Sequence, residues 1–183
     1  MTLPASFEGR ERVRLFCALR LPDAALDALS EWQAGHLEGG RVVPRGHLHL
    51  TLAFLGHRPV GDLGAITGAL RGAASAARPI RFLPERYRET RSVGMLVLTD
   101  VGGAATSLAE DLFPRLEGEG VYARERRAWL PHVTVLRFRR PPRLRPPLPD
   151  LGEVVPSDAA VFLSRLRPSG AEYVVVESFA LGG

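Results

Sequence analysis

The chain has 183 residues, 24 basic and 20 acidic, for a net charge of +4, and 45% of its residues are hydrophobic, which is typical of one globular unit. All 24 basic residues are arginine. This excludes a P-loop and any lysine nucleophile, including that of an ATP-dependent ligase that adenylates itself. One cysteine, Cys17, excludes an internal disulfide and a cysteine-rich zinc site. No apolar run approaches the ~20 residues that span a bilayer, so we expect a cytoplasmic protein without membrane contact.

The first half of the chain alternates predicted strands and helices. Short apolar or alternating runs predict strands, and apolar residues at a spacing of three or four predict helices. The expected elements are a strand over 13–19, a helix over 24–37, a strand over 48–55 and a helix over 62–77.

The second half contains more strands than helices. A segment with five prolines, 139–150, is expected to be an extended loop. The other expected elements are strands over 80–87 and 92–100, a helix over 104–116, a short strand over 121–123, and strands over 132–138, 161–166 and 173–178. This order lacks a regular βαβ repeat and therefore predicts an α+β fold.

Two predicted strands carry the same short motif, His49-Leu50-Thr51-Leu52 and His132-Val133-Thr134-Val135. Side chains at i and i+2 of a strand lie on one face, so each histidine should project beside the threonine that follows it. In the first strand the intervening leucines and Phe54 should face a core. Two such strands side by side would line a groove with two imidazoles and two hydroxyls.

This set of groups suits the cleavage of a phosphodiester. One imidazole can remove a proton from the attacking oxygen while the other protonates the leaving oxygen, since histidine titrates near neutral pH. Threonine hydroxyls can donate to the phosphate oxygens, where charge builds up in the transition state. The chemistry needs no metal and no cofactor. The near symmetry of the motifs leaves the donor and the acceptor unassigned.

Arginine is concentrated around the second motif. Residues 124–145 contain eight arginines and one acid, Glu125. Guanidinium groups bind phosphate oxygens bidentately, so this segment suits a phosphate-rich partner such as RNA. Of Arg126 and Arg127, alternation would point one inward. Phe54, Tyr87 and Phe138 are candidates for stacking on a base.

Two other interpretations remain open. The groove could belong to a non-catalytic module that binds RNA or nucleotides. Alternatively, His47 and His49 could be two ligands of a metal-dependent hydrolase, although the sequence shows no third ligand nearby.

The motifs resemble those of the 2H phosphoesterase superfamily, in particular the RNA 2',3'-cyclic phosphodiesterases, also called 2'-5' RNA ligases. The resemblance runs nearly end to end. It includes Arg14 to Leu19 as the opening strand, His47 to Gly56 and Pro131 to Arg137 as the motif strands, and Ser164 to Tyr173 in the closing hairpin. It implies one domain over 1–183, with two pseudo-symmetric antiparallel-sheet lobes and outer helices around a central cleft.

The resemblance also implies an activity, the hydrolysis of a terminal 2',3'-cyclic phosphate to a 2'-phosphate. An RNA end and a small cyclic nucleotide both fit this chemistry as substrates, and we expect the protein to be a monomer. His49 would donate a proton to the leaving 3' oxygen, and His132 would accept one from water. Thr51, Thr134 and Arg137 would hold the phosphate. The reverse reaction would join RNA ends through a 2'-5' bond without ATP. His47 stands where the family often has asparagine, and we expect it, with Arg127, to assist binding.

Overall fold

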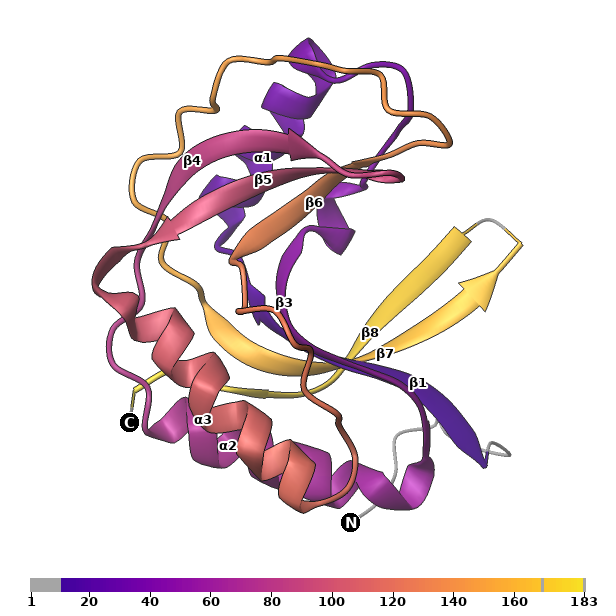
Figure 1. Cartoon of the computed structure of the whole chain (residues 1–183), viewed down its shortest axis with the longest axis vertical. Coiled ribbons are helices and arrows are strands. Elements are labelled where there is room, and N and C mark those ends of the chain that lie inside the picture. The colour runs from indigo at the N-terminus through magenta and orange to yellow at the C-terminus, as the bar shows by residue number, and fades with distance from the viewer. Residues whose placement is uncertain (1–10, 169, 183) are drawn as a thin grey trace.

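The computed structural model describes residues 11–168 and 170–182 (Figure 1). In this part of the chain there are eight strands, three α-helices and three 3-10 helices. The strands are β1 (Arg12–Arg20), β2 (Arg41–Val42), β3 (His49–Pro59), β4 (Phe82–Glu89), β5 (Val93–Asp100), β6 (His132–Arg137), β7 (Asp158–Arg167) and β8 (Gly170–Phe179). The helices are α1 (Asp23–His36), α2 (Leu63–Ser75) and α3 (Ala104–Gly118), with 3-10 turns η2 (Arg45–His47), η3 (Val60–Asp62) and η4 (Val101–Gly103).

The strands form a curled antiparallel sheet in the order β4-β5-β6-β3-β1-β7-β8, and β2 pairs with β6. Its two halves, β4-β5-β6 and β3-β1-β7-β8, meet where Leu50 of β3 pairs with Val133 of β6. Figure 1 shows the halves bending away from this junction, so that the β4–β5 and β7–β8 hairpins project toward the same side. This confirms the predicted α+β fold with two antiparallel parts around a central cleft.

The helices cover the outer face of the sheet. In α2, Ile66, Leu70 and Ala74 are fully buried, as the helical spacing of apolar residues predicts. The helix packs against α3, β7 and β8. Helix α1 lies behind the other half, where the buried Gln33 side chain donates hydrogen bonds from Nε2 to the carbonyls of Val43 (3.0 Å) and Val135 (2.7 Å). These contacts tie α1 to the strand that carries the second motif.

The prediction that Phe54 faces the core is wrong, because its side chain is 50% exposed. The register of β3 against β1 shifts twice, between Leu15 and Phe16 and between Cys17 and Ala18. Each shift leaves one extra residue on β3, and a bulge of this kind reverses the inward and outward alternation. Leu52 and Ala53 are consequently both buried, and Phe54 turns to the cleft side.

Two further details differ from the sequence expectation. Residues 121–123 form no strand; the Val121 amide instead donates to the Leu116 carbonyl and ends α3. The two-residue strand β2 was not expected, because it is too short to show a period. In the connection between β7 and β8, Ser169 lies outside the described residues. Among the helices described, none is long and apolar enough to cross a membrane.

Candidate active site

Both motifs line one pocket of about 210 Å³ between the two halves of the sheet. His49 and Thr51 reach it from β3, and His132 and Thr134 reach it from β6. The buried pair Leu50–Val133 lies on the opposite face. Extending this antiparallel register by one residue each way places His49 opposite Thr134 and Thr51 opposite His132. The duplicated sequence therefore produces a local two-fold arrangement.

Each catalytic candidate is held in the same way by the backbone. His49 Nδ1 lies 2.7 Å from the carbonyl oxygen of His47, and His132 Nδ1 lies 2.8 Å from that of Leu130. A carbonyl only accepts, so Nδ1 carries the proton in both rings and Nε2 is the atom available for proton transfer. In His49 this Nε2 accepts from the Thr51 hydroxyl at 3.1 Å. Both imidazoles are thus oriented for acid–base chemistry.

The surroundings of the two rings differ. His49 packs on aromatic rings, with ring centroids 4.9 Å from Phe16, 5.9 Å from Phe162 and 5.6 Å from Tyr173. Burial against these rings is the main cause that lowers the pKa of His49 to about 4, and nearby positive charge, including Arg137, adds to the effect. In the free site His49 is therefore neutral at pH 7.

Arg137 and His47, both predicted to bind substrate, line the same pocket. Arg137 is the last residue of β6 and is exposed. His47 belongs to the 3-10 turn η2 and not to β3, so strand alternation does not determine its position. Its ring lies 4.5 Å from that of Tyr173. Burial lowers the pKa of His47, followed by the charges of Arg41 and Arg137.

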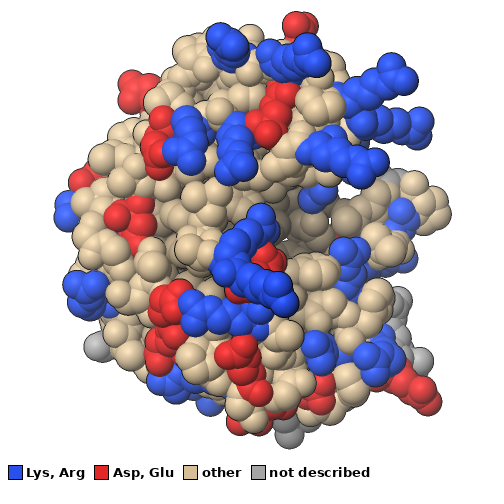
Figure 2. Space-filling model, in the orientation of Figure 1, with Lys and Arg blue, Asp and Glu red and all other residues tan. Residues whose placement is uncertain are grey.

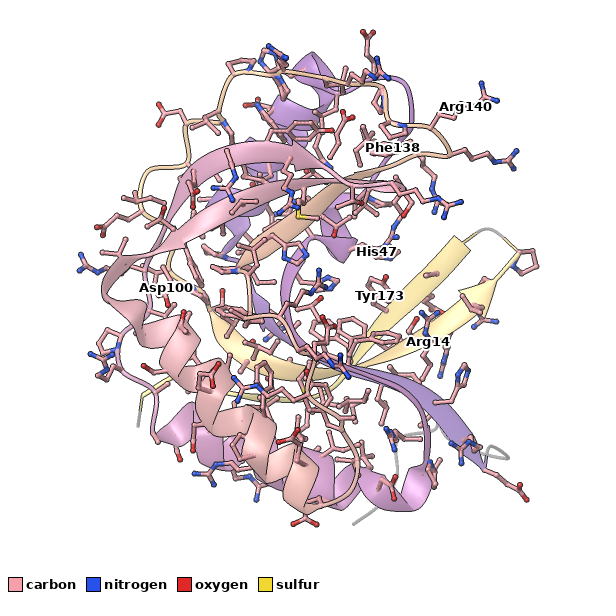
Figure 3. All side chains as sticks on the ribbon, viewed as in Figure 1. Arg14, His47, Asp100, Phe138, Arg140 and Tyr173 are labelled. Atoms are coloured by element: carbon pink, nitrogen blue, oxygen red, sulfur yellow. The ribbon has the colours of Figure 1, made fainter. Side chains whose placement is uncertain are left out.

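Sequence reasoning missed several lining residues, including Arg14, Arg41, Ser164 and Tyr173. Figure 3 shows His47 and Tyr173 close together at the open side of the molecule, with Arg14 below them on β1. Period-2 spacing from Phe16 could have indicated Arg14. The others come from segments that only the curled sheet brings to the motif strands.

Arg127 does not line the pocket that holds the two motifs. It lies in an irregular segment, where strand alternation does not apply, and its Nε donates to Glu125 at 2.6 Å. It borders a neighbouring cavity of about 510 Å³ that also touches Thr51 and His132. In the same segment, Trp129 Nε1 donates to the Thr51 carbonyl at 3.0 Å. Arg127 therefore lies beside the motif pocket rather than in it.

The three candidates for base stacking differ in the exposure and the contacts of their rings. Phe54 lines both the motif pocket and the neighbouring cavity, and the Arg14 guanidinium lies 4.9 Å from its ring centroid. Tyr87 packs against Trp32, and its hydroxyl donates to Glu89. Phe138 is buried. An exposed aromatic ring beside the reacting groups makes Phe54 the best placed of the three.

No group of three or more His, Cys, Asp or Glu side chains suited to hold a metal ion occurs in the part of the chain that the structure describes. Both ring nitrogens of His49 already have hydrogen-bond partners, the His47 carbonyl and the Thr51 hydroxyl. The His47–His49 pair considered for zinc therefore has no further protein ligand within these residues.

The chain is similar to known phosphoesterases in sequence and in fold. Residues 19–86 match the model of the LigT like Phosphoesterase family. The chain is 31% identical to an RNA 2',3'-cyclic phosphodiesterase of Thermus thermophilus, over 93% of this chain and 91% of the relative. A crystal structure of a Thermus thermophilus protein superposes with a TM-score of 0.78 at 31% identity, covering 93% and 98% of the two chains. The apo structure of LigT from E. coli gives a TM-score of 0.81 at 24% identity, covering 95% and 100%.

Proposed function

Since the chain belongs to the LigT-like 2H phosphoesterases, the family of RNA 2',3'-cyclic phosphodiesterases, we propose that it opens a 2',3'-cyclic phosphate with His49 and His132 as acid and base. The observation that carries this proposal is the meeting of both His-x-Thr pairs and Arg137 in one pocket. The equivalent backbone hydrogen bonds that leave each Nε2 for proton transfer support it further.

The proposed reaction starts with a cyclic phosphate held by the hydroxyls of Thr51 and Thr134 and by the Arg137 guanidinium. Water attacks phosphorus while His132 Nε2 takes its proton. The bond from phosphorus to the 3' oxygen breaks, and His49 Nε2 gives its proton to that oxygen. The products are a 2'-phosphate and a free 3' hydroxyl. Hydroxyl and guanidinium donors stabilise the charge that builds up on the phosphate oxygens.

The lowered pKa of His49 fits a donor that is charged only when substrate is present. A bound phosphate brings negative charge to the ring, which favours the imidazolium form and raises the pKa of His49 again. The Thr51 hydroxyl that binds Nε2 in the free site can then donate to a phosphate oxygen. Protonation of His49 is thus coupled to the binding of the phosphate.

The base of the terminal nucleotide is proposed to stack on Phe54, whose exposed ring borders the motif pocket. Arg127 would contact the substrate from the neighbouring cavity. His47 would assist by holding His49 through its carbonyl. ATP-independent joining through a 2'-5' bond would use the same groups, with the 5' hydroxyl of a second RNA end in place of the attacking water.

We also propose that the enzyme is a monomer of one domain and that it acts in the cytoplasm on RNA ends. The wholly buried thiol of Cys17 is compatible with a reducing compartment. Light scattering of the purified protein tests the monomer, and fractionation of cells that produce it tests the location.

The test is hydrolysis of a 2',3'-cyclic nucleotide in EDTA, with the product identified as the 2'-phosphate. Replacing either histidine in His49→Ala or His132→Ala should lower kcat by about 10²–10⁴-fold, while circular dichroism shows an intact fold. His36→Ala, on the last turn of α1, is the matched control and should keep the wild-type rate. Tight binding of the nucleotide without turnover by the wild-type protein would instead indicate a binding module.

A further inference from the structure

Two arginines face each other at the rim of the pocket. Arg41 of β2 and Arg137 of β6 are direct register partners, and both line the pocket. Like charges at directly opposed positions destabilise a sheet. Here the pair stands beside the reacting groups, where an anionic ligand would relieve it.

The pair continues into an open groove outside the catalytic pocket. We call the hollow lined by Gly39, Gly40, Arg41, Arg137, Phe138, Arg139 and Arg140 the basic groove. Within residues 11–168 and 170–182, none of its four arginines forms an ion pair with a carboxylate. Figure 2 shows arginines gathered along the upper right edge of the molecule, above the hollow between its two halves. Figure 3 places Arg140 on this side, beyond Phe138.

Two glycines, Gly39 and Gly40, line the basic groove with backbone alone. A Cβ atom on Gly40 would lie 2.6 Å from the Arg137 carbonyl oxygen, and one on Gly39, whose φ is +72°, would lie 2.7 Å from Pro142. Glycine at both positions lets the 39–40 segment pack directly against the segment after β6. Glycines in such places allow a backbone or a ligand to approach closely. The groove is therefore lined by four arginines and, at Gly39 and Gly40, by backbone alone.

We propose that the basic groove binds the phosphates of the RNA chain that precedes the cyclic end, so that an oligonucleotide is a better substrate than a mononucleotide. This rests on the proposed function, because the cyclic phosphate in the motif pocket fixes where the chain begins. Arg137 and Arg41 line the motif pocket, where the reacting phosphate is proposed to bind. Arg139 and Arg140 lie outside the pocket, where only a ligand with further phosphates can reach them.

The chemistry of the groove favours the backbone of a single strand over its bases. Guanidinium groups bind phosphate oxygens without reading sequence. Phe138 is buried beneath the groove and offers no exposed ring on which a base could stack. We therefore expect tolerance of sequence and dependence on chain length.

The experiment compares a 2',3'-cyclic mononucleotide with a hexanucleotide that ends in a 2',3'-cyclic phosphate. For each protein the ratio of kcat/KM, hexanucleotide over mononucleotide, is measured. The double variant Arg139→Gln/Arg140→Gln should lower this ratio about tenfold, and the salt slope of log kcat/KM for the hexanucleotide should become shallower by about 1.4, since each phosphate contact on a single strand contributes about 0.7.

The matched control is Arg71→Gln/Arg78→Gln, which removes the same charge from the exposed helical side of the molecule. It should leave the ratio and the salt slope at the wild-type values. An unchanged ratio in Arg139→Gln/Arg140→Gln overturns the proposal, whether both rates fall together or neither falls. An equal fall in both double variants overturns it as well, because net charge would then explain the effect.

Hydrolysis of the mononucleotide distinguishes failure of the proposed function from failure of the groove proposal. If the wild-type protein hydrolyses neither substrate, the catalytic proposal fails, and the groove is judged from fluorescence anisotropy with a labelled hexanucleotide that ends in a 3'-phosphate. A roughly tenfold weaker Kd in Arg139→Gln/Arg140→Gln alone then supports the groove. Equal Kd values for the three proteins refute it.

Discussion

Burial of His49 against aromatic rings should make the stability of the protein depend on pH. In the unfolded chain its pKa returns to the ordinary value of 6.5, whereas in the folded chain it is about 4. Between these values the unfolded state binds the proton and the folded state does not. The free energy of unfolding therefore rises with pH across this window and falls as the pH drops from about 6.5 to 4.

The size of the effect follows from the two pKa values. Each unit of difference corresponds to about 1.36 kcal/mol, and integration from pH 7.5 to pH 4.5 gives a loss of at most about 2.5 kcal/mol from this one residue. Other groups titrate in the same range, so the contribution of His49 is isolated by subtraction. The free energy of unfolding is measured by urea denaturation of the wild type and of His49→Gln at both pH values.

The wild type should lose about 2.5 kcal/mol more than His49→Gln between pH 7.5 and pH 4.5. His57→Gln, a substitution at a histidine outside the motif pocket, serves as the control and should behave like the wild type. If the wild type and His49→Gln lose stability in parallel, the aromatic rings do not keep the proton off His49. His49 would then not be a donor that is charged only when substrate is bound.

Two further predictions follow from single contacts. Gln33→Ala removes both hydrogen bonds to the carbonyls of Val43 and Val135 and should lower the free energy of unfolding by about 2 kcal/mol. Glu31→Ala, at an exposed neighbouring position, is the control and should change it little. Equal urea midpoints for the two variants would contradict this prediction. Phe54→Leu should raise KM for 2',3'-cyclic AMP about tenfold through lost stacking with kcat nearly unchanged, and a fall in kcat at constant KM would show that the ring does not bind the base.

The fold could be predicted from the sequence wherever one face of an element is buried. Ile66 and Leu70 in α2, and Leu108 and Leu112 in α3, repeat at helical spacing and are buried as expected. The alternation of His49, Leu50 and Thr51 likewise predicts which side chains face the core. In each case the burial pattern follows the period of the element.

The orientation of Phe54 could not be predicted from the periodicity of its strand. Whether a strand contains a bulge depends on its register with a partner strand, and here that partner is β1, far away in the sequence. One bulge between Thr51 and Ala53 of β3 turns the side chain of Phe54 from the core to the cleft. Arg41 was missed for a related reason, since β2 exists only through its pairing with β6. Long-range pairing, rather than local propensity, decided both positions.

The two histidines are alike in a feature that the local sequence determines and differ in one that long-range packing determines. Their symmetry is local, because in each motif Nδ1 is held by the carbonyl two residues before the ring, and the repeated sequence is enough to produce it. Their difference is not local, because the rings against His49 come from β1, β7 and β8. These strands lie on one side of the β3–β6 junction. Attachment of the same motif to unequal halves of the sheet therefore gives the two imidazoles different surroundings, and the aromatic rings on one side lower the pKa of His49.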